Sequence, residues 1–132
     1  MLVETGGVFE AYCSARRVCD MALRIKGIDR QKITPRAVYM LAKNGDSIAK
    51  KIWFEYGRHL GYGIGNVAVS FNPEVVVITG GLSRAYEFFK DGIMKTLKAY
   101  KMRKPIESIK IHITSTKAVG VLGCADFAMQ EL

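Results

Sequence analysis

Apolar residues recur every three or four positions along most of the chain, which is the spacing of helices that bury one face. This pattern predicts three helices in the first half of the chain, over residues 8–26, 35–43 and 46–71. Thr34 followed by Pro35 is a favourable start for the second helix, and Asp46 can cap the third. Asn72 and Pro73 end the third helix, because the residue before a proline disfavours helical geometry.

Two short segments in the second half have the composition of β-strands. Val75–Thr79 is a run of β-branched residues, typical of a strand that is buried on both faces. Ile109–Ile113 alternates apolar and polar residues, which predicts a half-buried strand. We expect helices over residues 84–99, capped by Ser83, and 119–131, with a loop at Pro105. The order predicts a parallel pair of strands. Because two strands make a poor sheet, we expect further strands, from missing chain or from a partner, to complete it.

Three glycines recur every four residues on the long third helix, at Gly57, Gly61 and Gly65. Each glycine inside a helix costs about 1 kcal/mol relative to alanine. Their spacing on one face therefore indicates that another segment of backbone passes close to the helix there.

The composition is that of a folded protein. Nearly half of the 132 residues are apolar, which is enough for a core and fits a single domain over residues 1–132. No apolar run approaches the roughly 20 residues of a membrane helix, and the start of the chain lacks the pattern of a signal peptide. We therefore expect a cytoplasmic protein without membrane contact.

The formal net charge of +8 fits nucleic acid, an anionic small ligand or simple solubility. The densest basic group, Lys95–Lys104, surrounds the expected end of a helix, where cations suit the helix dipole. A solvated face therefore explains the charge better than a nucleic-acid site. The cysteines Cys13, Cys19 and Cys124 have no metal-binding spacing, and we interpret them as buried free thiols.

The first expected strand ends in Gly80 and Gly81, and a helix is expected to begin shortly afterwards. Ligands of open α/β sheets bind beyond the carboxyl ends of strands, where glycine lets the backbone approach a ligand and amide groups near a helix start favour phosphate. An ordinary turn that needs a positive φ angle explains the same residues. The two interpretations weigh equally on this segment alone.

Four segments, in the same order, resemble the C-terminal region of ROK-family sugar kinases. They are Glu10–Ala15, Leu60–Asn66, Phe71–Ser83 and Gly120–Ala125. The last resembles the family's closing G-x-x-G-A-A helix, with Cys124 in place of the first alanine of that pair. Together the four resemblances extend over nearly the whole chain.

The resemblance implies an α/β, ribonuclease-H-like fold of the sugar kinase, Hsp70 and actin superfamily. The chain would form its C-terminal lobe, rich in helices and with a small parallel sheet. Gly80 and Gly81 would then lie against the adenosine and α-phosphate of ATP. The nucleotide site that we expect comprises Gly80, Gly81, Leu82 and Ser83.

The resemblance also implies a sugar contact and a hinge. Glu10 would accept hydrogen bonds from sugar hydroxyls, although the helix dipole alone also favours a glutamate in a first helical turn. Gly123 and Ala125 would lie on a connecting helix near the hinge between the lobes.

Several elements of these kinases have no counterpart in the sequence. The Asp-x-Gly-Gly-Thr phosphate loop, the Asn-Asp pair that holds the catalytic base and the Glu-x-Gly-His sugar motif are all missing. Because phosphoryl transfer needs positioning, a metal and a base together, we expect no catalytic residue and no activity in the chain alone. ATP and Mg²⁺ would serve the complete kinase. The cysteine positions of the family's zinc motif fall on Met1, Val3 and Val8, which predicts no zinc site.

Three functions compete. The first is the ATP-binding portion of a kinase for a hexose such as glucose, with nucleotide and sugar as partners. The second is a DNA-binding module around Asn44–Gly45, but the next helix carries Trp53 and Phe54 in an apolar stripe, where a recognition helix needs a polar face. The third is an assembly domain, such as the effector and dimerisation part of a ROK-type transcriptional regulator, which would form a homodimer through this lobe.

Overall fold

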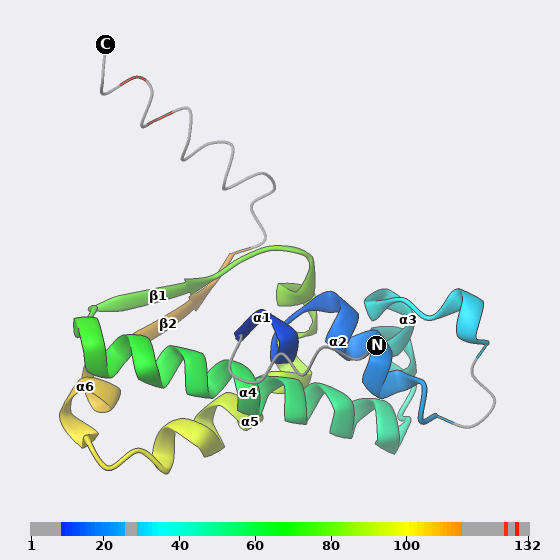
Figure 1. Cartoon of the computed structure of the whole chain (residues 1–132), viewed down its shortest axis with the longest axis horizontal. Helices are drawn as coiled ribbons and strands as arrows, with labels where there is room; N and C mark the ends of the chain where they lie inside the picture. Colours follow the sequence, from blue (N-terminus) through cyan, green and yellow to red (C-terminus); the bar gives the residue numbers. More distant parts are fainter. Residues whose placement is uncertain (1–8, 26–28, 115–125, 127–128, 130–132) are drawn as a thin grey trace.

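The computed structural model describes residues 9–25, 29–114, 126 and 129 of the chain. The helices are α1 (Phe9–Tyr12), α2 (Ala15–Ala22), α3 (Pro35–Lys43), α4 (Ser47–Phe71), α5 (Tyr86–Lys98) and α6 (Arg103–Ser108), the 3₁₀ turns are η1 (Arg30–Lys32) and η2 (Gly81–Ala85), and the strands are β1 (Val75–Ile78) and β2 (Lys110–Ile113). Helix α4 runs through the length of the molecule (Figure 1). The sheet lies beside its C-terminal half, α2 and α3 lie around its N-terminal half, and α1 lies over its middle, where Tyr12 contacts His59.

The caps predicted for α3 and α4 are confirmed. The Oγ1 atom of Thr34 accepts a hydrogen bond from the N–H of Ala37 at 3.1 Å. The Oδ1 atom of Asp46 does the same for the N–H of Ala49 at 2.7 Å. Asn72 ends α4 in the left-handed conformation, with φ of 46°, which asparagine tolerates better than most residues.

The single helix expected over residues 8–26 is wrong, because the chain forms two helices there. Ser14 has an extended backbone between α1 and α2, and its Oγ accepts a hydrogen bond from the N–H of Arg17 at 3.2 Å. A serine side chain that satisfies a free backbone donor in this way favours a new helix start over continuation of the old one. The apolar spacing continues across the break, so periodicity alone did not reveal it.

The close packing predicted at the glycines of α4 is confirmed. A Cβ atom on Gly57 would overlap the backbone carbonyl oxygen of Phe89 on α5. A Cβ atom on Gly61 would lie 2.8 Å from the Cβ of Thr96 and 3.0 Å from the carbonyl oxygen of Ile93. The two helices therefore approach each other backbone to backbone, and this contact is the largest between any two elements of the described chain.

Gly65, the third glycine of this series, makes room for a side chain instead. The ring of Tyr100 occupies the space that a Cβ on Gly65 would need. The Tyr100 hydroxyl lies 2.9 Å from the carbonyl oxygen of Tyr62 and 2.8 Å from Oδ1 of Asn66, within hydrogen-bond distance of both. The glycine thus allows a tyrosine beyond α5 to bond to α4.

Strands β1 and β2 pair in parallel, with Val75 opposite Lys110, which confirms the predicted arrangement. Burial of β1 on both faces is wrong for the described structure. Val76 and Ile78 contact the core, whereas Val75 and Val77 are 43% and 55% exposed. In the described part of the chain the helices cover one face of the sheet only.

The segment after β1 also differs from its prediction. The turn η2 precedes α5, and Ser83 lies inside this turn rather than at a helix cap. The first residue of α5 is Tyr86, and no side chain caps its start. Pro105, expected in a loop, is the third residue of α6, since a proline in the first turn of a helix removes no intrahelical hydrogen bond.

One cluster of buried apolar side chains joins the helices. Its largest fully buried members are Val18, Val38, Trp53, Phe89 and Ile93. Cys13 and Cys19 are free thiols, and they are half-buried rather than buried. The expected last helix over 119–131 lies outside the described residues apart from positions 126 and 129, and the single domain over 1–132 stays a prediction.

Candidate functional site

The turn at the end of β1 is open on its outer side. Gly80 has φ of 97°, a left-handed conformation that favours glycine over residues with a side chain. A Cβ atom on either Gly80 or Gly81 would meet no atom within 4 Å. No described residue therefore fills the space directly over these two glycines, as a ligand site at this position requires.

Ser83 stabilises the turn from within. Its side chain is buried, and its hydroxyl donates a hydrogen bond to the carbonyl oxygen of Gly80 at 2.7 Å. The backbone N–H of Ser83 reaches the same oxygen at 3.2 Å. Its hydroxyl also lies 3.4 Å from the carbonyl oxygen of Thr114, just after β2. The geometry thus makes Ser83 a residue that shapes the turn.

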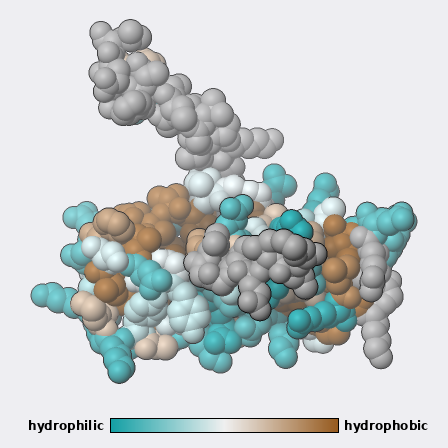
Figure 2. Space-filling model, in the orientation of Figure 1, coloured by the Kyte–Doolittle hydropathy of each residue, from teal (hydrophilic) through white to brown (hydrophobic). Residues whose placement is uncertain are grey.

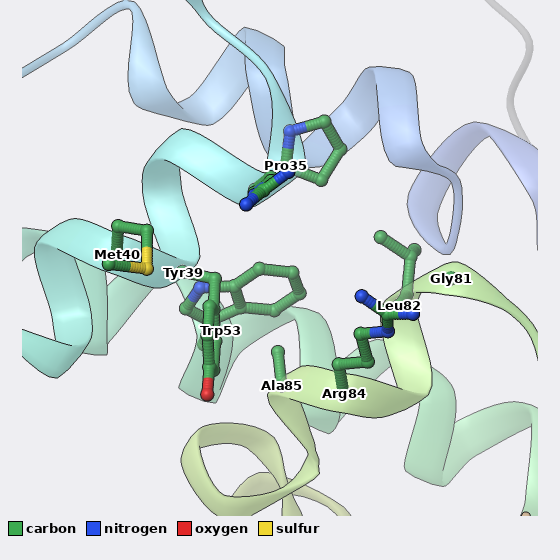
Figure 3. Close-up of a pocket in the computed structure, with 9 residues that line it drawn as sticks. Pro35, Tyr39, Met40, Trp53, Gly81, Leu82, Arg84 and Ala85 are labelled. Carbon is green, nitrogen blue, oxygen red and sulfur yellow. The ribbon is translucent and has the colours of Figure 1, made fainter. Parts of the chain in front are cut away.

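A cavity of about 550 Å³ opens beside this turn, between α3, α4 and η2. We call it the Trp53 cavity, and it is lined by Pro35, Arg36, Tyr39, Met40, Trp53, Gly81, Leu82, Arg84 and Ala85. Figure 3 shows Trp53 between Tyr39 on one side and the residues of η2 on the other. Of the four predicted nucleotide-site residues, the structure places Gly81 and Leu82 in this lining.

The aromatic wall of the cavity is fixed by its neighbours. Trp53 is only 1% exposed, and its Nε1 is a buried donor without a hydrogen-bond partner in the described part of the chain. Tyr39 contacts the ring of Phe88 edge-on, with centroids 5.8 Å apart, and its hydroxyl donates to Oε1 of Glu87 at 3.4 Å. An aromatic wall held by these contacts suits a planar ligand.

The charge of the cavity is positive. Arg36 of α3 and Arg84 of η2 are exposed residues in its lining, and the lining contains no carboxylate. Neither arginine forms an ion pair with another described residue. Two free guanidinium groups at one cavity favour an anionic ligand.

A model of the ROK family matches residues 5–131, which is nearly the whole chain. The chain belongs to the ROK family. An uncharacterised protein of Clostridium perfringens is 31% identical over 131 residues, 99% of this chain and 44% of that protein. A xylose repressor of Caldicellulosiruptor bescii is 26% identical over 102 residues, 76% of this chain and 26% of the repressor. This ROK chain therefore spans less than half the length of these relatives.

The solved structures show the same fold. A ROK-family glucokinase from Streptomyces griseus, determined in complex with glucose and AMPPNP, superposes with a TM-score of 0.75. The two are 23% identical, and the match covers 94% of this chain and 45% of the glucokinase. The prediction of a helix-rich, ribonuclease-H-like α/β fold with a small parallel sheet is confirmed. The family includes both sugar kinases and repressors, so membership alone leaves the activity open.

Sequence reasoning identified the turn of this ROK chain but missed the rest of the cavity. Tyr39 and Arg36 lie on α3, more than one element away from the turn, and only the folded chain brings them to η2. Trp53 did give a signal, because it is the single tryptophan of the sequence. Its place in an apolar stripe, however, is equally typical of a core residue.

Glu10, the predicted sugar contact, is exposed at the second residue of α1. It does not line the Trp53 cavity, and its role stays a prediction. Its neighbour Tyr12 lies over His59, with ring centroids 5.2 Å apart. Burial lowers the pKa of His59, and the positive charge of Arg17 lowers it further, which favours a neutral imidazole in this aromatic pair.

The remaining predictions concern the hinge, the zinc motif and membrane contact. Gly123 and Ala125, the expected hinge residues, and the zinc-motif positions Met1, Val3 and Val8 lie outside the described residues. Within the described ranges, no three His, Cys, Asp or Glu side chains gather as metal ligands would. None of the helices described has both the length and the apolar character needed to span a bilayer.

Proposed function

We propose that this chain is the nucleotide-binding portion of a hexose kinase and that ATP binds in the Trp53 cavity. One observation carries the proposal: the open glycine turn at the end of β1 borders an aromatic, positively charged cavity. Its volume of about 550 Å³ lies within the range of small-molecule sites. A glycine turn at the end of β1 without an adjoining cavity would have supported only the alternative, a purely structural turn.

The residues divide into groups suited to the parts of a nucleotide. Tyr39, packed in front of the buried Trp53, offers an aromatic surface for the base, and Gly81 allows the backbone to approach the ribose and α-phosphate. Arg36 and Arg84 attract the phosphates. Because the lining holds no carboxylate, Mg²⁺ would be held by the phosphates and by groups of the complete kinase. A kinase of this kind would work in the cytoplasm, where its nucleotide is available.

The test uses Trp53 as an intrinsic probe, since it is the only tryptophan. We expect its fluorescence to change on titration with AMPPNP, and calorimetry to give the same dissociation constant. Gly81→Val should weaken binding at least about tenfold, because the new side chain would project into the cavity. The fold should survive, because a Cβ there meets no atom within 4 Å.

The matched control is Ser70→Val, an exposed position on α4 outside the cavity. It should bind AMPPNP as the unchanged chain does. Equal affinity in the Gly81→Val chain would remove the assigned nucleotide site. Thermal unfolding of both variants by circular dichroism would confirm that each is folded.

A second candidate is the effector and dimerisation part of a ROK-type transcriptional regulator, favoured by the similarity to the xylose repressor over 76% of this chain. An effector domain would bind sugar without needing a nucleotide. Sugar binding in the absence of any response to AMPPNP would therefore favour this candidate. Binding to duplex DNA that weakens steeply with salt would instead support a DNA-binding module.

Homodimer formation is part of the proposal for either candidate. An apolar surface is exposed over β1 and the end of α4, where Phe71 is 78% and Val77 55% exposed. Figure 2 shows this surface in brown. Exposed apolar patches of this kind mark association surfaces.

A further inference from the structure

Another cavity lies between α5, α6 and β2. We call it the α5–α6 groove, and it is lined by Tyr86, Met94, Leu97, Lys98, Arg103, Ile106, Glu107, Ile109 and Ile111. Its volume is about 460 Å³, and none of its lining residues belongs to the Trp53 cavity. Figure 1 shows α6 beside the end of α5. Six of the nine lining residues are apolar, so an occupant would gain by burying apolar side chains there.

Exposed methionines lie at this groove and next to it in the chain. Met94 in the lining is 47% exposed, and Met102, just before α6, is 56% exposed. Methionine side chains are flexible and polarisable, and they are overrepresented at surfaces that accept apolar side chains of varied shape. The groove therefore has the properties of a docking surface rather than those of a core defect.

The groove is bordered by positive charge. Lys98 lines the groove, Lys101 lies in the connection between α5 and α6, and Lys104 is the second residue of α6. All three are exposed, and none forms an ion pair with another described residue. Arg103 is held in place, because its Nε lies 3.2 Å from Oε1 of Glu107 and its NH1 donates to the carbonyl oxygen of Lys98 at 2.9 Å. The sequence has no acidic residue between Asp91 and Glu107. A partner would thus meet an apolar floor with a cationic border.

We propose that the α5–α6 groove binds an amphipathic, acidic helix of another protein. The apolar face of that helix would contact Leu97, Ile106 and Met94, and its carboxylates would face Lys98 and Lys101. Helix-in-groove recognition combines these two contributions: the apolar anchors supply affinity, and the charges supply orientation. The proposal does not depend on nucleotide binding, because the two cavities share no residue.

A second copy of this chain does not fit the same groove. The chain carries a net charge of +8, and its 12 acidic residues are spread along the sequence, with none within three positions of another. Two such surfaces would bring like charges together, which opposes association. Nucleic acid would match the lysines but would leave the apolar floor unoccupied.

The test uses a fluorescent synthetic helix of about 18 residues, with Leu and Phe on one face and Glu on the other. Two control peptides carry Lys in place of Glu, or Ser in place of the apolar residues. We expect only the first peptide to raise the fluorescence anisotropy, and its affinity to fall when salt rises from about 50 to about 200 mM. Met94→Glu, and separately Lys98→Glu with Lys101→Glu, should each weaken binding at least about tenfold.

Lys50→Glu with Lys51→Glu is the charge-matched control, because both lysines are exposed on α4 and neither lines the groove. Its affinity should stay within about twofold of the unchanged chain. The proposal fails if the acidic peptide does not bind, if either control peptide binds equally well, or if the groove variants bind normally. Vesicles of phosphatidylserine give a further test. If the unchanged chain binds them, the Met94→Glu chain does not, and the acidic peptide fails to compete, the groove is a membrane contact and the proposal fails.

Discussion

The Cα of Gly57 on α4 faces the backbone carbonyl oxygen of Phe89 on α5 so closely that a methyl group on Gly57 would overlap that oxygen. The reverse also holds, because a Cβ on Gly92 of α5 would overlap the carbonyl oxygen of Phe54 on α4. The two helices therefore cross at a pair of glycines. Tyr56, Trp53 and Phe89 surround this crossing with aromatic contacts, so its geometry also positions the wall of the candidate nucleotide cavity.

Gly57→Ala should destabilise the chain by about 1–3 kcal/mol, because backbone atoms cannot make room for the added methyl group. The higher helix propensity of alanine, about 1 kcal/mol, offsets only part of this effect. Urea denaturation followed by circular dichroism measures the difference. Gly63→Ala on the same helix is the control: the three atoms nearest its new Cβ all belong to the half-exposed ring of Phe9, which can move. Equal stability of the two variants would contradict the close crossing.

Tyr56→Phe should change the stability of the chain at high pH. Burial, and secondarily the nearby Cys13 thiol, raise the pKa of Tyr56 to about 12 from its ordinary 10.0. The unfolded chain therefore loses the Tyr56 hydroxyl proton near pH 10 while the folded chain keeps it. The contribution of this group to the free energy of unfolding is thus complete below pH 10 and is lost as pH rises toward about 12. The unchanged chain should lose on the order of 2 kcal/mol more than the variant across this interval.

The measurement is urea denaturation at intervals from about pH 8 to about pH 11.5. Phenylalanine keeps the ring that contacts Trp53 and Phe89, so the two chains should differ by less than about 1 kcal/mol near neutral pH. Cys13, whose own pKa burial raises to about 11, is present in both chains and its effect largely cancels. If the free energies of unfolding of the two chains change in parallel with pH over the whole range, the pKa of Tyr56 is not raised by folding.

Glu10→Gln should separate sugar binding from nucleotide binding. If the Glu10 carboxylate accepts hydrogen bonds from sugar hydroxyls, the amide loses a charge-assisted bond, which is worth about 1.5–3 kcal/mol. Glucose added in excess should then shift the amide NMR signals of α1 in the unchanged chain and not in the variant. The response of Trp53 to AMPPNP should be the same in both. Identical shifts with glucose would leave Glu10 as a residue favoured only by the helix dipole.

The sequence predicted several features whose physical cause lies in neighbouring residues. Thr34 and Pro35 define the start of α3 from neighbouring residues alone, and the structure begins that helix at Pro35 as expected. The glycine spacing on α4 predicted a close neighbour because the cost of glycine in a helix calls for a compensating contact. The break at Ser14 was hidden, because the apolar spacing on either side of it continues without interruption.

One part of the candidate site could be predicted from the sequence and another part could not. The turn at Gly80–Gly81 was predicted, because the end of a strand and a pair of glycines are both visible in the sequence. Tyr39 and Trp53 could not be placed beside it, since their position depends on how α3 and α4 pack against η2. Exposure of Val75 and Val77 was also unpredictable, because it depends on what covers the sheet and not on the residues of β1.

Val77→Lys should reduce self-association of the chain. The backbone of Glu74 and Ile78 bonds to β2, since their carbonyl oxygens accept hydrogen bonds from the N–H groups of Lys110 and Thr114. Alternation along a parallel strand therefore directs the backbone groups of Val75 and Val77 to the opposite edge. That edge adjoins the exposed apolar surface of β1, and lysine on an edge strand opposes pairing with another strand.

Sedimentation velocity over a range of concentrations measures the effect, and we expect the dissociation constant of the self-associated form to rise at least about tenfold in the Val77→Lys chain. Met102→Lys is the matched control, because Met102 is 56% exposed against 55% for Val77 and lies in the connection between α5 and α6 rather than on a strand. The control should associate as the unchanged chain does, since it adds the same charge elsewhere. A strictly monomeric unchanged chain, or an equal effect of both substitutions, would show that the β1 surface does not mediate association.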